Sequence, residues 1–355
     1  MIALSREMVR AAAYGGALLG GGGGGSIEEG MCLGNLAVAV GRPRLVDLDE
    51  LDDDALIVAV SAVGAPAAAD QYIEPIHYVQ ALLLLLEHLD APVAGLITSE
   101  NGGLSSLNGW FQSAVTGIPV ADAPCNGRAH PTGLMGSMGL DREMDYLSRQ
   151  AAVGGNPDRN RHVCLYVESG LDSASQLVRQ AAVRAGGVVA VARNPVTVAY
   201  VRENAAPGTL RQAIQVGKTL LEAENPVDAA RSVCDLLSGE LICRAMVENV
   251  ALRTKDGFDI GLVELSGGYE LTFWNEYMTL EHRGKRLATF PDLIATLSAD
   301  EIRPLTSAEI RAGQEVLLIQ APKEQLRLGA GMRRPELLRI AEEAVGKEMV
   351  RYVFG

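Results

Sequence analysis

The sequence predicts an α/β protein with an N-terminal, mostly parallel α/β domain followed by a mixed, β-rich second domain. Strand-like and helix-like segments alternate over the first 160 residues, which is the pattern of a parallel sheet. Short strand-like runs separated by turns dominate from about residue 240. The Gly-Gly-Asn-Pro-Asp stretch at 154–158 indicates a boundary, so we expect an α/β domain over 1–160 and a mixed domain over 161–355.

The first domain begins with two predicted helices on either side of a glycine run. We expect these helices at 5–19 and 28–40. The second is expected to begin just after the glycine run because Ser26 and Glu29 have the spacing of a capping box. The apolar runs at 56–63 and 93–98 predict buried strands, since turn residues follow each of them. The remaining expected elements are helices at 75–89 and 105–115 and a short strand at 118–120.

The second domain is predicted to start as α/β and to become β-rich. We expect strands at 162–168 and 188–192 and helices at 173–185, 210–221 and 226–237. Strands are then expected at 240–253, 258–265, 270–277, 279–281 and 315–319, before a final helix at 335–345. Within 270–277, Asn275 and Glu276 cannot both be buried on one face of a strand, so one of them is expected to face a ligand or an interface.

The composition predicts a cytoplasmic protein that binds a small molecule. The chain carries 31 basic and 44 acidic residues, a net charge of −13, which argues against nucleic acid and anionic membrane surfaces as partners. No secretory signal is evident, and the apolar stretch at 81–86 is too short to span a bilayer. Five cysteines without a C-x-x-C pair favour reduced thiols, and the apolar strands of the second half favour a homo-oligomer.

Six consecutive glycines, residues 20–25, form a glycine-rich loop. Glycine loses more backbone entropy on folding than other residues, so such a run in a globular chain indicates a special conformation. A glycine loop before a helix N-terminus presents backbone N–H groups to an anion. We therefore expect Gly22, Gly23 and Gly24 to contact the ligand, with a flexible linker as the alternative interpretation.

The densest cluster of polar side chains lies in the loop 122–133. In this loop Cys125 and His130 are candidates for nucleophile and base, and Arg128 for binding a carboxylate. Asp122 and Asn126 add a carboxylate and an amide. The alternative is a structured loop with an inert cysteine and an Arg–Asp ion pair.

A second polar cluster follows the strand at 93–98. Glu100 is a candidate general base, and Asn101 and Gly102 are candidates for substrate contacts. The alternative is the N-cap of the next helix. Ligands of parallel sheets bind beyond the carboxyl ends of the strands, where the loops at 64–66, 99–103 and 122–133 all lie. No metalloprotease, Walker or nucleophile-elbow motif occurs, and the glycine run satisfies the dinucleotide pattern trivially.

Taken in order, these motifs resemble the S-methyl-thiohydantoin desulfurase family. The resemblance covers residues 1 to about 320 and implies a two-domain α/β protein with a β-rich second part. It is carried by the glycine run, Gly64-Ala65-Pro66, Glu100-Asn101-Gly102-Gly103, Asp122 with Gly127-Arg128-Ala129-His130-Pro131, and Phe290-Pro291-Asp292-Leu293-Ile294. The chain departs from many relatives at Pro124, Cys125 and His130, which suggests a subgroup with its own substrate.

The resemblance implies a hydrolase that removes sulfur from a small 2-thiohydantoin-type ring. Such a substrate is a thiohydantoin propionate like that of ergothioneine breakdown, which would release sulfide, or an S-methyl derivative, which would release methanethiol. Cys125 would attack the ring, or Glu100 or Asp122 would activate water. His130 would protonate the leaving sulfur, and Arg128 would hold a substrate carboxylate.

Two alternatives stay open at this level. A zinc ion could supply hydroxide, with Cys125 and His130 as chemically suitable ligands, although no ligand triad has diagnostic spacing. The protein could also be a non-catalytic, hydantoin-binding accessory protein of a hydantoin or oxoproline hydrolase.

Overall fold

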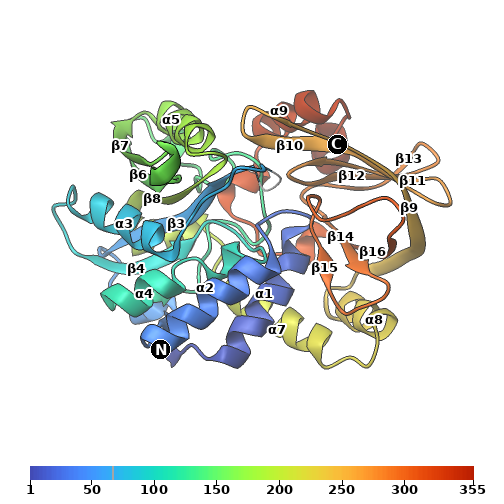
Figure 1. Cartoon of the computed structure of the whole chain (residues 1–355), viewed down its shortest axis with the longest axis horizontal. Coiled ribbons are helices and arrows are strands. Elements are labelled where there is room, and N and C mark those ends of the chain that lie inside the picture. Colours follow the sequence, from blue (N-terminus) through green and yellow to red (C-terminus); the bar gives the residue numbers. More distant parts are fainter. Residues whose placement is uncertain (66–67) are drawn as a thin grey trace.

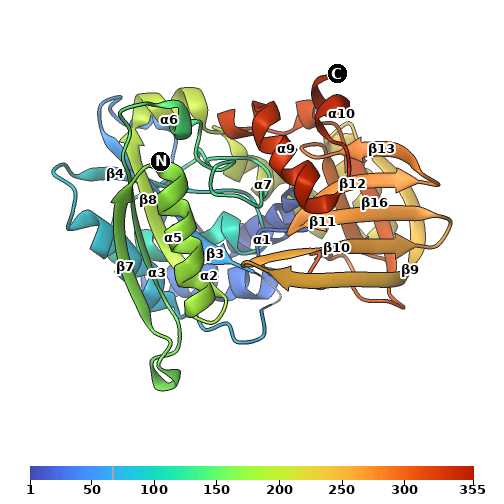
Figure 2. The same cartoon turned by 90° about the horizontal axis from the view of Figure 1, so that it is seen from above.

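The computed structural model describes residues 1–65 and 68–355, in which two sheets stand side by side (Figures 1 and 2). The turn expected at Gly64-Ala65-Pro66 lies partly outside the described residues, because it includes Pro66. An α/β part with parallel strands precedes an antiparallel, β-rich part, which confirms the predicted fold class.

The first sheet has a parallel centre that antiparallel strands extend. Its strand order, over the described residues, is β1-β2-β5-β4-β3-β8-β6-β7. The pairs β2–β5, β5–β4 and β4–β3 are parallel, whereas β8, β6 and β7 pair antiparallel. The strands are β1 (Ile2–Ala3), β2 (Arg44–Val46), β3 (Leu56–Gly64), β4 (Val93–Thr98), β5 (Val120–Ala121), β6 (Ser148–Gly154), β7 (Val163–Ser169) and β8 (Val188–Thr197).

This sheet continues past the predicted domain boundary at 160/161. That boundary falls inside a hairpin, because β6 and β7 pair from Ser148 opposite Ser169 to Gly154 opposite Val163. The turn-forming stretch at 154–158 connects these two strands, with Gly155 at φ 84°. The first sheet therefore includes residues up to 197, and the strands of the second sheet begin at 240.

Helices cover the first sheet and lead to the second. Figure 1 shows α5 (Leu171–Arg184) beside β6 and β7, on the opposite side of the sheet from the helices at the N-terminal end of the chain. Helices α1 and α7 cross so closely that a Cβ on Gly15 would lie 2.5 Å from the backbone nitrogen of Gly217. The other helices are α1 (Arg6–Gly20), α2 (Ile27–Val40), α3 (Pro75–Leu86), α4 (Trp110–Thr116), α6 (Val198–Asn204), α7 (Thr209–Leu221) and α8 (Pro226–Leu236).

The second sheet is antiparallel throughout its described strands. Its order is β13-β12-β11-β10-β9-β16-β14-β15, with helices α9 (Pro335–Val345) and α10 (Val350–Phe354) at the C-terminal end of the chain. The strands are β9 (Glu240–Lys255), β10 (Phe258–Leu265), β11 (Tyr269–Trp274), β12 (Glu276–His282), β13 (Lys285–Thr289), β14 (Leu293–Ser298), β15 (Pro304–Leu305) and β16 (Glu315–Ala321).

One difference from the expected strands matters for the site. The single strand expected at 270–277 is divided at Asn275, whose φ of 57° turns the chain between β11 and β12. The Asn275 side chain stabilises this turn by accepting a hydrogen bond from the Asp259 backbone N–H at 2.9 Å. Glu276 thereby becomes the first residue of β12.

The glycine loop lies where the two sheets meet. It follows α1, which Figure 1 shows reaching toward β14 and β15. The backbone N–H of Tyr277 donates to Gly21 O at 2.8 Å, and that of Ser307 donates to Gly22 O at 2.8 Å. Residues near the N-terminus are thus held by strands and loops more than 250 positions later in the chain.

Candidate functional site

A cavity of about 240 Å³ lies at this junction. Its walls come from the glycine loop, the end of β3, the loops after β4 and β5, α5, β8 and the start of β12. The loop residues at 64–65, 99–100 and 130–133 all line it, as expected for segments at the carboxyl ends of parallel strands. A volume below that of typical drug-sized pockets suits a small ring-sized ligand.

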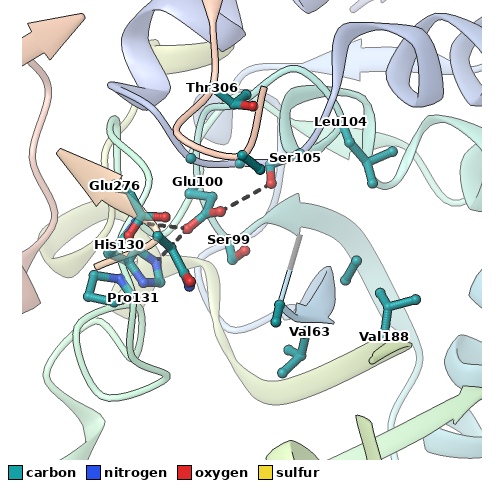
Figure 3. Close-up of a pocket in the computed structure, with 18 of the residues that line it drawn as sticks. Val63, Ser99, Glu100, Leu104, Ser105, His130, Pro131, Val188, Glu276 and Thr306 are labelled. Carbon is teal, nitrogen blue, oxygen red and sulfur yellow. Dashed lines mark hydrogen bonds and ion pairs between the residues drawn. The ribbon is translucent and has the colours of Figure 1, made fainter. Parts of the chain in front are cut away.

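Buried His130 and half-buried Glu100 form a pair on the cavity wall (Figure 3). The Nε2 of His130 lies 3.3 Å from Glu100 Oε2, which also accepts the His130 backbone N–H at 3.1 Å. Ser105 Oγ donates to the other carboxylate oxygen at 3.1 Å. The carboxylate is thus fixed from both sides against the imidazole.

The environment of His130 favours a neutral imidazole with a free lone pair. Burial lowers its pKa, and the Glu100 carboxylate opposes that shift. The Nδ1 lies 3.0 Å from the carbonyl oxygen of Thr132, which can only accept, so the proton of the neutral ring belongs on Nδ1. Nε2 is then the basic atom, and the neighbouring carboxylate would stabilise the imidazolium that forms on proton uptake.

Glu276 is a buried carboxyl group that also lines the cavity, and Figure 3 shows it beside Glu100 and His130. Its side chain is 2% exposed, and within the described residues its Oε2 has no hydrogen-bond partner. Burial, followed by the charge of Glu100, raises the pKa of Glu276 well above its usual value, although Arg128 opposes the shift. The raised pKa favours the protonated form of Glu276, which places an acid beside a proton acceptor, the arrangement of acid–base pairs.

The glycine loop leaves room for the side chain of Glu276. Gly21, Gly22, Gly24 and Gly25 have positive φ angles, and Gly22, Gly23 and Gly24 line the cavity. A Cβ on Gly23 would lie 2.6 Å from the Cγ and Cδ atoms of Glu276, so the absence of a side chain there lets the carboxyl group approach.

The end of the loop has the predicted local structure. Ser26 caps α2 by accepting the Glu29 backbone N–H at 3.1 Å. The helix start expected after the run is thus confirmed. That the loop glycines contact a ligand stays a prediction.

Arg128 connects the two halves of the molecule instead of lining the cavity. The guanidinium is fully buried and donates to the carbonyl oxygens of Tyr277 at 2.7 Å, Gly21 at 3.4 Å and Asp292. It also lies over the Phe290 ring, 4.7 Å from the centroid, and burial lowers its pKa to about 10. The motifs around 21, 128 and 290–292 thus meet in one structural contact, which replaces the expected carboxylate-binding role.

Cys125 and Asp122 also lie outside the described lining of the cavity. Cys125 is 1% exposed in an apolar cluster with Ala123 and Met138, and burial raises its pKa to about 12. A thiol in that state is a poor nucleophile. Asp122 Oδ1 accepts the Leu210 backbone N–H at 2.8 Å, and its Oδ2 lies 3.1 Å from Arg211 Nε. The expected ion pair between this aspartate and an arginine thus forms with a different arginine.

The remaining predicted contacts stabilise the loops around the cavity. Asn101 Nδ2 donates to Gly127 O at 3.1 Å, and its Oδ1 accepts from Ser106 Oγ at 2.9 Å. Asn126 Oδ1 accepts the Gly329 backbone N–H at 3.1 Å. Gly102 packs against Gly24 of the glycine loop so closely that a side chain on either residue would not fit. These residues orient Glu100 and His130 and do not face the cavity themselves.

Three cavity residues were anticipated only in part or not at all. Glu276 was one of two candidates in an aromatic strand, and the turn at Asn275 places both Asn275 and Glu276 on the cavity lining. Arg179 and Arg193 carry no sequence signal, because each is a single basic residue in an ordinary segment. Arg179 donates to the carbonyls of Gly64 and Gly257, each at 3.0 Å. It also donates to a third carbonyl, that of Pro131.

The described residues contain no group of three or more His, Cys, Asp or Glu side chains positioned to hold a metal ion. The predicted pair of zinc ligands is divided, since Cys125 packs in the core and His130 faces the cavity. In the part of the chain that the structure covers, no helix combines the length and the apolar character needed to cross a bilayer.

Comparisons with known proteins agree with the motifs. Residues 7–148 match the model of the S-Me-THD-like N-terminal domain, and residues 170–333 match that of the S-Me-THD-like C-terminal domain. A search of curated proteins finds no match. A crystal structure of a protein from Chromobacterium violaceum has a TM-score of 0.72 at 20% identity, over 97% of this chain and 96% of that chain, which supports the fold alone. From the two domain matches, which together span most of its length, the chain belongs to the S-Me-THD-like family.

Proposed function

We propose that this protein is a hydrolase that removes sulfur from a small 2-thiohydantoin-type ring. A thione substrate would release sulfide, and an S-methyl derivative would release methanethiol. The observation that carries the proposal is the meeting of the Glu100–His130 pair with the protonated Glu276 carboxyl group on one small cavity. Family membership supports a thiohydantoin-related substrate.

The pair supplies the base. Water attacks ring carbon 2, its proton passes to His130 Nε2, and the Glu100 carboxylate stabilises the resulting imidazolium. The π electrons of the thiocarbonyl bond move onto sulfur, and Glu276 donates its proton to that sulfur. The Glu100–His130 pair and Glu276 thus act on the same thiocarbonyl group.

Collapse of the tetrahedral centre completes the reaction. The C2–S bond breaks as the new carbonyl forms, and the hydroxyl proton returns to Glu276. His130 passes its proton to the departing hydrosulfide, so that both side chains regain their starting states and the net reaction is ring thione plus water to ring carbonyl plus hydrogen sulfide. Cys125 takes no part in this scheme, because it is buried away from the cavity.

The test is incubation of purified protein with 5-substituted 2-thiohydantoins and their S-methyl derivatives in ¹⁸O-labelled water. We expect loss of the thiocarbonyl absorbance, release of sulfide or methanethiol, and one ¹⁸O atom at carbon 2 of the product. Glu100→Gln should lower kcat by about 10²- to 10⁴-fold, the usual contribution of a general base. Glu29→Gln is the matched control, since Glu29 also lines the cavity but is exposed.

The alternative outcomes separate the competing functions. Tight binding of a hydantoin without turnover, together with a stable complex with a hydantoin hydrolase, would favour the accessory-protein role. If a chelator abolishes activity and added zinc restores it, the result would favour the metal-dependent route. Equal activity of Glu100→Gln and Glu29→Gln would remove the Glu100–His130 pair from the mechanism.

A further inference from the structure

Arg193 is a buried cation on the cavity wall, and it has no partner among residues 1–65 and 68–355. It lies on β8, its residue is 5% exposed, and it lines the cavity. Within the described residues, its guanidinium makes no hydrogen bond and no ion pair. A buried charge is unfavourable unless it is paired and hydrogen-bonded, so this position indicates a missing anionic partner.

The neighbours of Arg193 do not neutralise it. Glu100, whose charge acts on Arg193, is already engaged by His130 and Ser105. Glu276 is held in its neutral form by burial. On the adjacent strand β6, Gln150 stands opposite Arg193 and has an unpartnered carbonyl oxygen, but an amide oxygen carries no net charge.

Arg179, the other arginine that lines the cavity, differs from Arg193 because its donors are hydrogen-bonded. Arg179 donates to three backbone carbonyls and lies over the Phe258 ring, so its donors hold the walls together. The two guanidinium groups interact, since burial and then the positive charge of Arg193 lower the pKa of Arg179. The cavity thus holds one structural cation and one with unused donors.

The shape of this end of the cavity also favours an anion at Arg193. Gly133, which also lines the cavity, lies beside the guanidinium, since a Cβ there would be at ordinary contact distance, 3.5 Å, from Nη1. The planar fork of an arginine matches the two oxygens of a carboxylate. A single guanidinium with free donors suits a monoanion better than a dianionic phosphate.

We propose that Arg193 binds a carboxylate on the ring substituent of the substrate and thereby selects anionic thiohydantoins. This inference rests on the proposed function and narrows its substrate class. It gives Arg193 a role in specificity that the sequence suggested for Arg128, whose donors instead hold Gly21, Tyr277 and Asp292.

The experiment compares two 2-thiohydantoins that differ only at the end of the C5 substituent, one a carboxyalkyl and the other the carboxamide of equal length. We expect wild-type kcat/KM to favour the acid by about 30-fold, the effect of a charge-assisted contact. Arg193→Gln should reduce this ratio to near one, mainly through KM for the acid. Arg193→Lys, which keeps the charge and loses the fork, should give an intermediate ratio.

A binding measurement makes the test independent of turnover and of the stability of the variants. The two product hydantoins, acid and amide, are titrated into wild-type protein by calorimetry, where the acid should bind about 30-fold more tightly. Equal binding and equal turnover of the two would overturn the inference and leave the proposed function standing. A parallel fall of kcat for both substrates in Arg193→Gln would also overturn it, since Arg193 would then act on the reacting sulfur. Turnover of neither ring would instead refute the proposed function.

Discussion

Gly23→Ala tests whether the glycine loop positions the acid. Gly23 is the member of the 21–25 stretch whose φ is not positive, so alanine meets no backbone penalty there. Its Cβ would lie 2.6 Å from Cγ and Cδ of Glu276, whereas ordinary contact begins at 3.4 Å, and Glu276 Oε1 would be closer still. The carboxyl group must therefore move by about 0.8 Å.

The size of the effect follows from that displacement. A misplacement of about 1 Å in a catalytic group costs on the order of 10²-fold in rate, so we expect kcat to fall about 30- to 100-fold. Insertion of a methyl group into a packed site also costs about 1–3 kcal/mol of stability, which leaves a protein of this size folded. The measurements are sulfide release at saturating substrate and thermal unfolding.

Two controls make the result decisive. Gly170→Ala adds the same methyl group where nothing lies within 4 Å and φ is −53°, so it should retain wild-type kcat. The double variant Gly23→Ala/Glu276→Gln should lose no more activity than Glu276→Gln alone, because both changes act through one carboxyl group. The reasoning is refuted if Gly23→Ala stays within threefold of Gly170→Ala.

Two further variants follow from the pKa directions. Glu276→Gln should lower kcat by about 10²-fold or more and abolish the alkaline decline of the pH–rate profile. Because the pKa of folded Glu276 is raised, the folded state retains a proton that the unfolded chain releases, so stability falls as pH rises between the two pKa values. The glutamine variant should lack that fall when Tm is compared at pH 5 and pH 8. Cys125→Ala should retain most activity and lose about 1 kcal/mol of stability, measured by thermal unfolding, whereas a cysteine nucleophile would be inactivated.

Much of the fold and part of the site could be predicted from the sequence. The apolar runs that became β3 and β4 are long, continuous and followed by turn residues, and such signals are local. The strands β6, β13 and β14 were not expected, because their form depends on the neighbours with which they pair. The division of 270–277 depended on one residue, Asn275, adopting a left-handed conformation that its partner Asp259 stabilises.

The functional loops were found, but the direction of their side chains was not. Glu100 and His130 face the cavity, whereas Cys125 and Arg128, five and two residues before His130, point into the core. All four lie in polar, glycine-containing loops, so composition and spacing do not separate them. Arg128 is held in the core by the carbonyl oxygens of Tyr277 and Asp292, more than 140 residues away, whereas Cys125 packs in an apolar cluster.

The sequence by itself determined the family, the fold class and the glycine loop, since these depend on local backbone preferences and on the order of motifs along the chain. Only the tertiary structure decided which charged groups face the cavity. Arg128 and Arg193 are both buried arginines, but one is surrounded by carbonyl oxygens and the other borders an open cavity. The charge state and the accessibility of a side chain depend on the atoms packed around it, and those atoms come from distant parts of the chain.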